Sequence, residues 1–392
     1  MTHIPIPMLL VIAVLGPVAL GVMIAIQPEI GASLGVSPQQ TQYALSSAFF
    51  MLGCSYLFAG KIIDRIGYQQ ALSVSGGCFC LSLLLGATAS SYEMFVTART
   101  LQALSGSFGF VVVRAHFFQC FDEKKATQLL GCLVVVSTLC PMFAPMFGSY
   151  MVKWFGWRFL YWSLFGLSAV LYMYIYSVRA NVVGRLPSEV LSGYVQKSIW
   201  GEFNVRFVLS ALSSSLASGV FFTFIAVGPS AMLNEFAIDG EGFGLLYVMP
   251  SIAFASAGFY FGRKAASVPF EKFFYKSVFV SMAGLVCMWL AIAYKTIFGY
   301  MVSMMILNFG NGLLVPAMCA YVFIHIAQSP PLASGLLGFI QMTIAGGVSF
   351  VAIELASETL QAMGLMMSVC IILSCIFTSC LVLIFPSGSE AV

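Results

Sequence analysis

An arginine placed inside an apolar stretch is the residue of this chain most suited to chemistry within a membrane. Only 8% of the 392 residues are charged, yet Arg99 lies in such a stretch, followed at helical spacing by Gln102, Gly106 and Gly109. This spacing puts all four on one helix face. A charge at that depth is costly unless it is paired or faces water, so Arg99 and Gln102 are predicted to bind a solute. The structural alternative is an arginine bonded to carbonyl groups of neighbouring helices.

Three carboxamide side chains are further candidates for binding a solute. They are Asn308 and Asn311 in LNFGNGLLVP and Gln341 in GFIQMTIAGG. An amide facing lipid would be unfavourable, so these side chains are expected to face the interior, either bonding helix to helix or contacting a solute. Phe221 and Phe222 are predicted to line the same cavity.

Acidic residues are absent from the middle of the apolar stretches. Glu29 and Glu354 lie near the ends of theirs and are the candidates for coupling to protons. A buried Arg99 without an acid favours an anionic organic solute, for example a carboxylate siderophore.

The spacing of residue types excludes other classes of protein. No nucleophile, base and third group can be assembled, so an enzyme is not expected. Phosphate-cradling loops are absent, which excludes an ATP-driven pump. The eleven cysteines lie mostly in apolar runs without metal-ligand spacing, so neither a metal nor another cofactor is expected, and nothing indicates nucleic-acid binding.

Composition indicates that these residues are positioned by membrane-spanning helices. Hydrophobic residues make up 60% of the chain and the mean hydropathy is +0.98. Soluble proteins have about 25% charged residues. Apolar runs of about 20 residues, long enough to cross a bilayer, recur along the chain. We therefore predict an all-α integral membrane protein with twelve spans, at roughly 8–28, 42–61, 70–89, 93–117, 127–150, 157–178, 206–232, 243–262, 273–294, 297–326, 332–355 and 363–385.

Polar connectors divide these spans into two groups of six. The longest connector is predicted to be a cytoplasmic linker at 179–205, between six-helix bundles at 1–178 and 206–392. Of the 17 Lys and Arg residues, twelve fall in connectors on one side and three on the other. The basic side of a membrane protein is cytoplasmic, which predicts both termini in the cytoplasm. The expected location is the bacterial inner membrane.

A charged connector between the second and third spans carries a recognisable motif. It reads GKIIDRIGYQQ and contains Gly60, Asp64, Arg65 and Gly67. With the six-plus-six arrangement, it resembles the loop signature of the major facilitator superfamily. The resemblance implies two bundles that alternately expose a central site, and a latch in which Asp64 meets the start of the eleventh span and Arg114. The alternative is that the basic residues only anchor the topology.

Two further motifs narrow the resemblance. The fourth-span stretch RTLQALSGSFGFVVVRA is similar to the bicyclomycin-resistance branch of drug:proton antiporters. In the fifth span, Pro145 and Gly148 resemble the antiporter signature, which implies a helix pivot against the eighth span. The branch usually has an acid in the first span, but that position falls near Gly21, which cannot carry a proton.

The resemblance implies a monomeric secondary transporter in the lipid bilayer that exports a drug or metabolite in exchange for protons. Two alternatives stay open. One is a transporter of an organic anion in either direction. The other is a transporter-like sensor that binds a solute without moving it.

Overall fold

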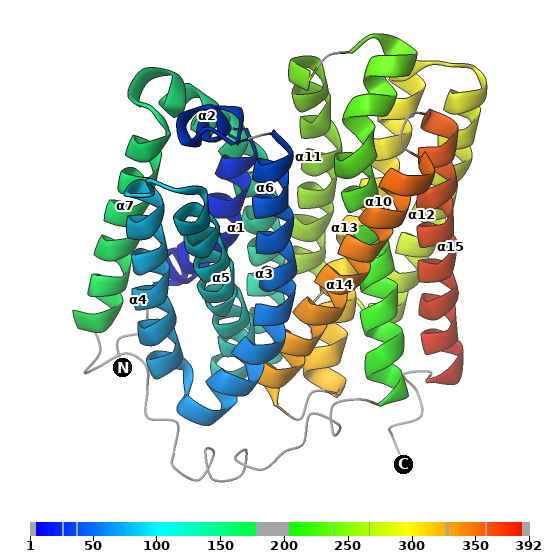
Figure 1. Cartoon of the computed structure of the whole chain (residues 1–392). Coiled ribbons are helices and arrows are strands. Elements are labelled where there is room, and N and C mark those ends of the chain that lie inside the picture. Colours follow the sequence, from blue (N-terminus) through cyan, green and yellow to red (C-terminus); the bar gives the residue numbers. More distant parts are fainter. Residues whose placement is uncertain are drawn as a thin grey trace. The chain divides into compact units, whose positions relative to one another are not determined.

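The computed structural model describes residues 5–25, 27–36, 38–177, 204–238, 240–265, 267–326, 329–356 and 359–385, and every regular element within them is an α-helix (Figure 1). The described helices are α1 (Ile6–Ala25), α2 (Gln27–Leu34), α3 (Pro38–Ile66), α4 (Tyr68–Ala87), α5 (Tyr92–Cys120), α6 (Glu123–Phe155), α7 (Trp157–Ser177), α10 (Val205–Phe236), α11 (Gly240–Lys264), α12 (Phe270–Ala293), α13 (Ile297–His325), α14 (Pro330–Ala356) and α15 (Leu360–Ile384).

Twelve of these helices contain 20 or more residues, and each coincides with one of the twelve predicted spans. Seven are long and apolar enough, within the described residues, to cross a membrane by length and composition. The remaining helix, α2, was not predicted separately. It begins two residues after α1 ends, with Pro28 in its first turn, where a missing backbone N–H costs no helical hydrogen bond.

The chain packs as two compact units. Unit 1 comprises Met1–His116, Cys140–Ile199 and Ser329–Phe339. Its apolar core is formed by side chains of α1, α4, α5, α6 and α7, and α4 packs along α7. This core positions Arg99, which lies on α5.

Glycines bring α1 and α5 into backbone contact within unit 1. A Cβ atom at Gly16 would lie 2.6 Å from the Gly106 carbonyl oxygen, and one at Gly109 would lie 2.5 Å from the Ile12 carbonyl oxygen. Only residues without a side chain allow helices to approach this closely. Gly106 and Gly109, which the sequence placed on the Arg99 face, therefore serve to seat α5 against α1.

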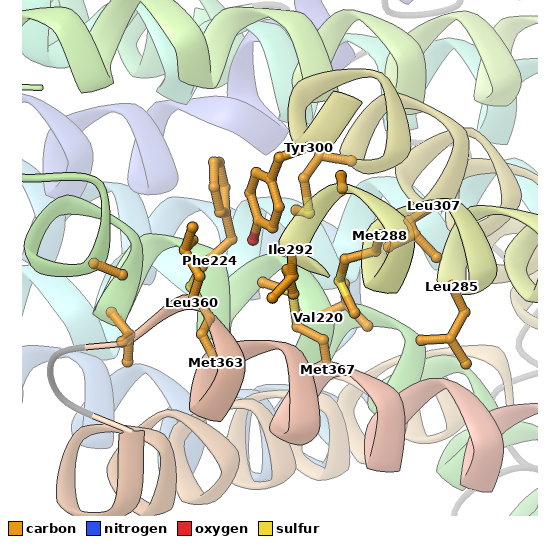
Figure 2. Close-up of a cluster of buried hydrophobic side chains, with 14 of the residues drawn as sticks. Val220, Phe224, Leu285, Met288, Ile292, Tyr300, Leu307, Leu360, Met363 and Met367 are labelled. Atoms are coloured by element: carbon orange, nitrogen blue, oxygen red, sulfur yellow. The ribbon is translucent and has the colours of Figure 1, made fainter. Parts of the chain in front are cut away.

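Unit 2 comprises Phe117–Leu139, Trp200–Gln328 and Ile340–Val392. Its central helix is α13, which contacts α10, α11 and α12 and is buried along most of its length. Figure 2 shows Met363 and Met367 extending from α15 towards Met288 of α12. Flexible thioether side chains fill irregular gaps between helices, which suits a core shared by α10, α12, α13 and α15.

Three helices contribute to both units, and one of them is α5, whose last residues from Phe117 on belong to unit 2. The first part of α6, up to Leu139, belongs to unit 2, and the first part of α14, up to Phe339, belongs to unit 1. The first part of α6 packs against α11 through glycines, and the first part of α14 packs against α3 in the same way. The bundle boundaries at 178 and 206 stay a prediction, and the predicted linker lies almost wholly outside the described residues.

A carboxylate from another helix caps the N-terminus of α15. The backbone N–H of Leu360 donates to Glu235 Oε1 at 2.9 Å, while the Thr359 hydroxyl accepts from the N–H of Ala362. Removing a helix cap typically costs about 1 kcal/mol. We expect Glu235→Ala to lower the free energy of unfolding by about this amount, measured by denaturant unfolding in detergent. Glu235→Gln keeps an acceptor oxygen and should lose less. Equal losses in both variants would argue against a capping role.

Candidate functional site

Arg99 and Gln102 form a buried pair on α5. Arg99 Nη1 donates a hydrogen bond to Gln102 Oε1 at 2.5 Å, and the two side chains are 2% and 1% exposed. The i, i+3 spacing predicted from the sequence is what brings them together. The Tyr161 hydroxyl of α7 lies close enough to interact with the guanidinium charge. The sequence predicted the first two residues as neighbours but gave no signal for Tyr161.

Aromatic rings pack around Tyr161. Phe95, Trp157 and Tyr161 meet edge to face, with ring centroids 6.0–6.4 Å apart. Trp157 Nε1 donates to Ser33 Oγ at 2.9 Å, which ties α7 to α2. The Tyr161 ring fills the space that a side chain at Gly86 of α4 would occupy. This packing therefore comes from four helices, and its geometry could not follow from any one segment.

A second group of candidate residues meets on α10 and α14 in unit 2. Gln341 Nε2 donates to Ser218 Oγ at 2.7 Å, and the Ser218 hydroxyl donates to the Ser214 carbonyl oxygen at 2.9 Å. One turn further along α10, Phe221 and Phe222 meet edge to face at 5.9 Å. Gln341, Phe221 and Phe222 are half-buried. They offer an amide beside aromatic rings, a combination typical of sites for small organic molecules.

The two asparagines of α13 have different surroundings. Asn308 and Asn311 are 0% and 3% exposed, and Asn308 Nδ2 donates to the Met304 carbonyl oxygen at 2.9 Å. Asn308 Oδ1 and Asn311 Nδ2 have no hydrogen-bond partner among the described residues. The expected interior location is what the structure shows, and contact with a solute stays a prediction.

The N-terminal part of α14 lies against α3, where the sequence motif predicted a latch. A Cβ atom at Gly60 would lie 2.7 Å from the Pro331 carbonyl oxygen, and one at Gly335 would lie 2.5 Å from the Tyr56 carbonyl oxygen. Gly338 faces the ring of Tyr56. The two helices thus touch backbone to backbone within unit 1, and Tyr56 is a contact residue that sequence reasoning missed.

The other latch residues surround this contact. Gly67 separates α3 from α4 with a φ of 80°, a conformation that favours glycine, and Arg65 is exposed. Asp64 belongs to α3, but its side chain lies outside the described set. Arg114 is 4% exposed and stacks over the Phe110 ring at 4.5 Å. The predicted pairing of Asp64 with Arg114 therefore stays a prediction.

The predicted pivot region of α6 continues as a helix through Pro145, whose side chain is outside the described set. A Cβ atom at Gly148 would lie 2.6 Å from Val22 Cγ1 of α1. The contact of α6 with α11 occurs at a different place, where a Cβ atom at Gly131 would lie 2.6 Å from the Gly262 Cα atom. Gly131 was missed because a lone glycine in LLGCLVVV carries no signal of its partner.

The structure describes no interaction partner for either candidate for proton coupling. Glu29 is exposed in the first turn of α2, and the side chain of Glu354 in α14 lies outside the described set. Among the residues that the structure describes, no group of three or more His, Cys, Asp or Glu side chains could hold a metal ion.

Long apolar helices joined by close glycine crossings, with a few buried polar groups, are typical of a multi-pass membrane protein. The sequence profile of the Major Facilitator Superfamily matches residues 8–352. The chain therefore belongs to this superfamily, and the predictions of its fold, with twelve membrane helices in two six-helix bundles, and of a transporter rather than an enzyme are confirmed.

Individual proteins extend this similarity. The chain is 22% identical over 355 residues to the bicyclomycin resistance protein homolog of Haemophilus influenzae, with 88% of each chain covered. It is 24% identical over 214 residues to the multidrug resistance protein MdtL of Klebsiella pneumoniae, a match that spans 54% of each chain. Among solved structures, the proton:xylose symporter XylE superposes with a TM-score of 0.75 over 95% of this chain and 94% of that chain, at 10% identity. The similarity to XylE concerns the fold alone.

Proposed function

We propose that the protein exports small organic, drug-like molecules across the bacterial inner membrane, with both termini in the cytoplasm. The observation that carries this proposal is the match over 88% of each chain to a protein named for bicyclomycin resistance. The half-buried surface formed by Gln341, Phe221 and Phe222 suits such solutes, because rings bind apolar bodies and the amide orients a polar group.

Transport in this proposal depends on the contact between α3 and α14. Transporters of this architecture move a solute by rocking their halves around a central site. The Gly60–Gly335 crossing is close enough to hold two helix ends together and has no interlocking side chains at its centre. It therefore suits an element that must open and close once per cycle. Asp64 and Arg114 are proposed to adjust the stability of the closed form.

Proton antiport is the proposed source of energy. The carboxylates proposed to carry the proton are Glu29, which is exposed, and Glu354. An exposed carboxylate exchanges protons with water readily, and its access would change as the transporter opens. Neither residue is in the position near Gly21 that the related branch uses.

The proposal is tested in a bacterial host that lacks its main efflux pumps. Expression should raise resistance to several drugs, including bicyclomycin and chloramphenicol. Gln341→Leu should change the pattern of resistance between drugs, because it removes the amide and the bond to Ser218. Thr343→Leu, at an exposed position of the same helix, is the matched control and should not change it.

The coupling of drug export to proton movement is measured in inside-out membrane vesicles with an acidified lumen. Adding a transported drug should release protons from the lumen, seen as a rise in the fluorescence of a pH-sensitive dye. Glu29→Gln or Glu354→Gln should abolish the release if that residue carries the proton. Efflux that persists without a proton gradient would contradict antiport.

A second candidate function is transport of an organic anion such as a carboxylate siderophore. Arg99 favours it, because no described carboxylate pairs with this buried cation. Uptake or export of labelled polycarboxylates, with no effect on drug resistance, would support this candidate against the first.

A further inference from the structure

Three neighbouring hydrogen-bond donors in unit 1 are buried without a well-formed hydrogen bond. Arg99 Nη2, Gln102 Nε2 and the Tyr161 hydroxyl have no hydrogen-bond partner among the described residues. They belong to a single connected cluster, because Arg99 bonds to Gln102 and interacts with Tyr161. A buried polar group without a partner is uncommon in proteins and calls for a specific explanation. Three donors together, one of them cationic, form an arrangement that matches an anion.

The charge of the cluster supports the same conclusion. Glu29 and Glu93, the acidic side chains of unit 1 that the structure describes, are both exposed, and neither pairs with Arg99. An uncompensated buried charge costs several kcal/mol, and removing such a charge from water is favourable only when it is paired and hydrogen-bonded. An anion would supply both the counter-charge and the acceptor for all three donors.

The packing limits the size of that anion. The three side chains are at most 2% exposed, and the rings of Phe95 and Trp157 lie 6.4 and 6.0 Å from the Tyr161 ring, measured between centroids. The Tyr161 ring in turn fills the gap at Gly86. A bulky organic solute would have to displace these rings, so the cluster favours a small anion.

We propose that Arg99, Gln102 and Tyr161 bind a small monovalent anion of the size of chloride. The ion neutralises Arg99 and ties α5 to α7. This role is separate from the transported solute and does not depend on which solute the protein moves.

The experiment measures the thermal unfolding of the purified full-length protein in detergent, without any drug. Sodium chloride is titrated against sodium gluconate at constant ionic strength, and sodium citrate forms a third arm. Chloride should raise the unfolding temperature in a saturable way, because a ligand that binds only the folded state stabilises it. Gluconate should not.

Variants assign the effect to the cluster. Tyr161→Phe removes one hydroxyl and preserves the ring packing, so it should fold and should raise the chloride concentration for half-saturation by about tenfold, as expected for one lost hydrogen bond to a charged group. Arg99→Gln should abolish the chloride effect. Arg206→Gln, which removes an arginine stacked over Phe385 in unit 2, is the matched control and should retain it.

Several results would overturn the proposal. Equal stabilisation by chloride and gluconate, or an unchanged half-saturation in Tyr161→Phe, would exclude a chloride-sized site in this cluster. Stabilisation by citrate but not chloride, lost in Arg99→Gln, would assign the cluster to an organic-anion solute instead. Drug resistance is measured separately, so failure of drug export would leave a chloride effect standing, and the reverse also holds.

Discussion

Replacing Gly335 by valine is expected to abolish transport. A Cβ atom at this position would lie 2.5 Å from the Tyr56 carbonyl oxygen and 3.0 Å from the Gly60 Cα atom. Both neighbours are backbone atoms, which cannot rotate away as a side chain can. The helices α3 and α14 must then separate, and the contact proposed to close during the cycle cannot form. Drug resistance in the efflux-deficient host should fall to the level of the empty vector.

The control for this variant lies on the same helix. A Cβ atom at Gly346 would meet nothing within 4 Å, so Gly346→Val makes the same chemical change in α14 without the collision. It should retain most of the resistance. Both proteins must be present in the membrane at similar amounts, measured by immunoblot. Equal activity of the two variants would show that the α3–α14 contact is not needed for transport.

Replacing Gly109 by valine is expected to have the largest effect on stability. A Cβ atom there would lie 2.5 Å from the Ile12 carbonyl oxygen and 3.1 Å from Ile12 Cγ2, in the crossing of α1 and α5. Overpacking of a tight core costs about 1–3 kcal/mol. We expect the free energy of unfolding to fall by about this amount, and the yield of folded protein to fall with it.

A matched variant separates this collision from the general cost of valine in a helix. Gly77 lies inside α4, and a Cβ atom there would meet nothing within 4 Å. Gly77→Val should therefore leave the unfolding temperature in detergent nearly unchanged. A similar loss in both variants would mean that helix propensity, rather than the α1–α5 contact, sets the effect.

The fold was largely predictable because the signals that define it are local. A run of about 20 apolar residues commits a segment to a membrane helix whatever surrounds it, since the backbone must satisfy its own hydrogen bonds there. Each of the twelve predicted spans lies on a long helix.

The candidate site was predictable only in part. The spacing of Arg99 and Gln102 sufficed to place them together, because residues three apart on a helix are neighbours in any fold. The bond from Gln341 to Ser218 joins two helices far apart in the sequence, and nothing in either segment indicates the other.

By itself, the sequence determined that this is an α-helical membrane protein, where its helices lie, and that it holds an arginine among apolar residues. The tertiary structure decided which groups meet: Tyr161 beside Arg99, α14 against Gly60, and Gly131 against Gly262. The physical reason is that helix formation depends on neighbouring residues. The rotation and crossing of two helices depend instead on the packing of whole surfaces, in which a missing side chain matters as much as a charged one.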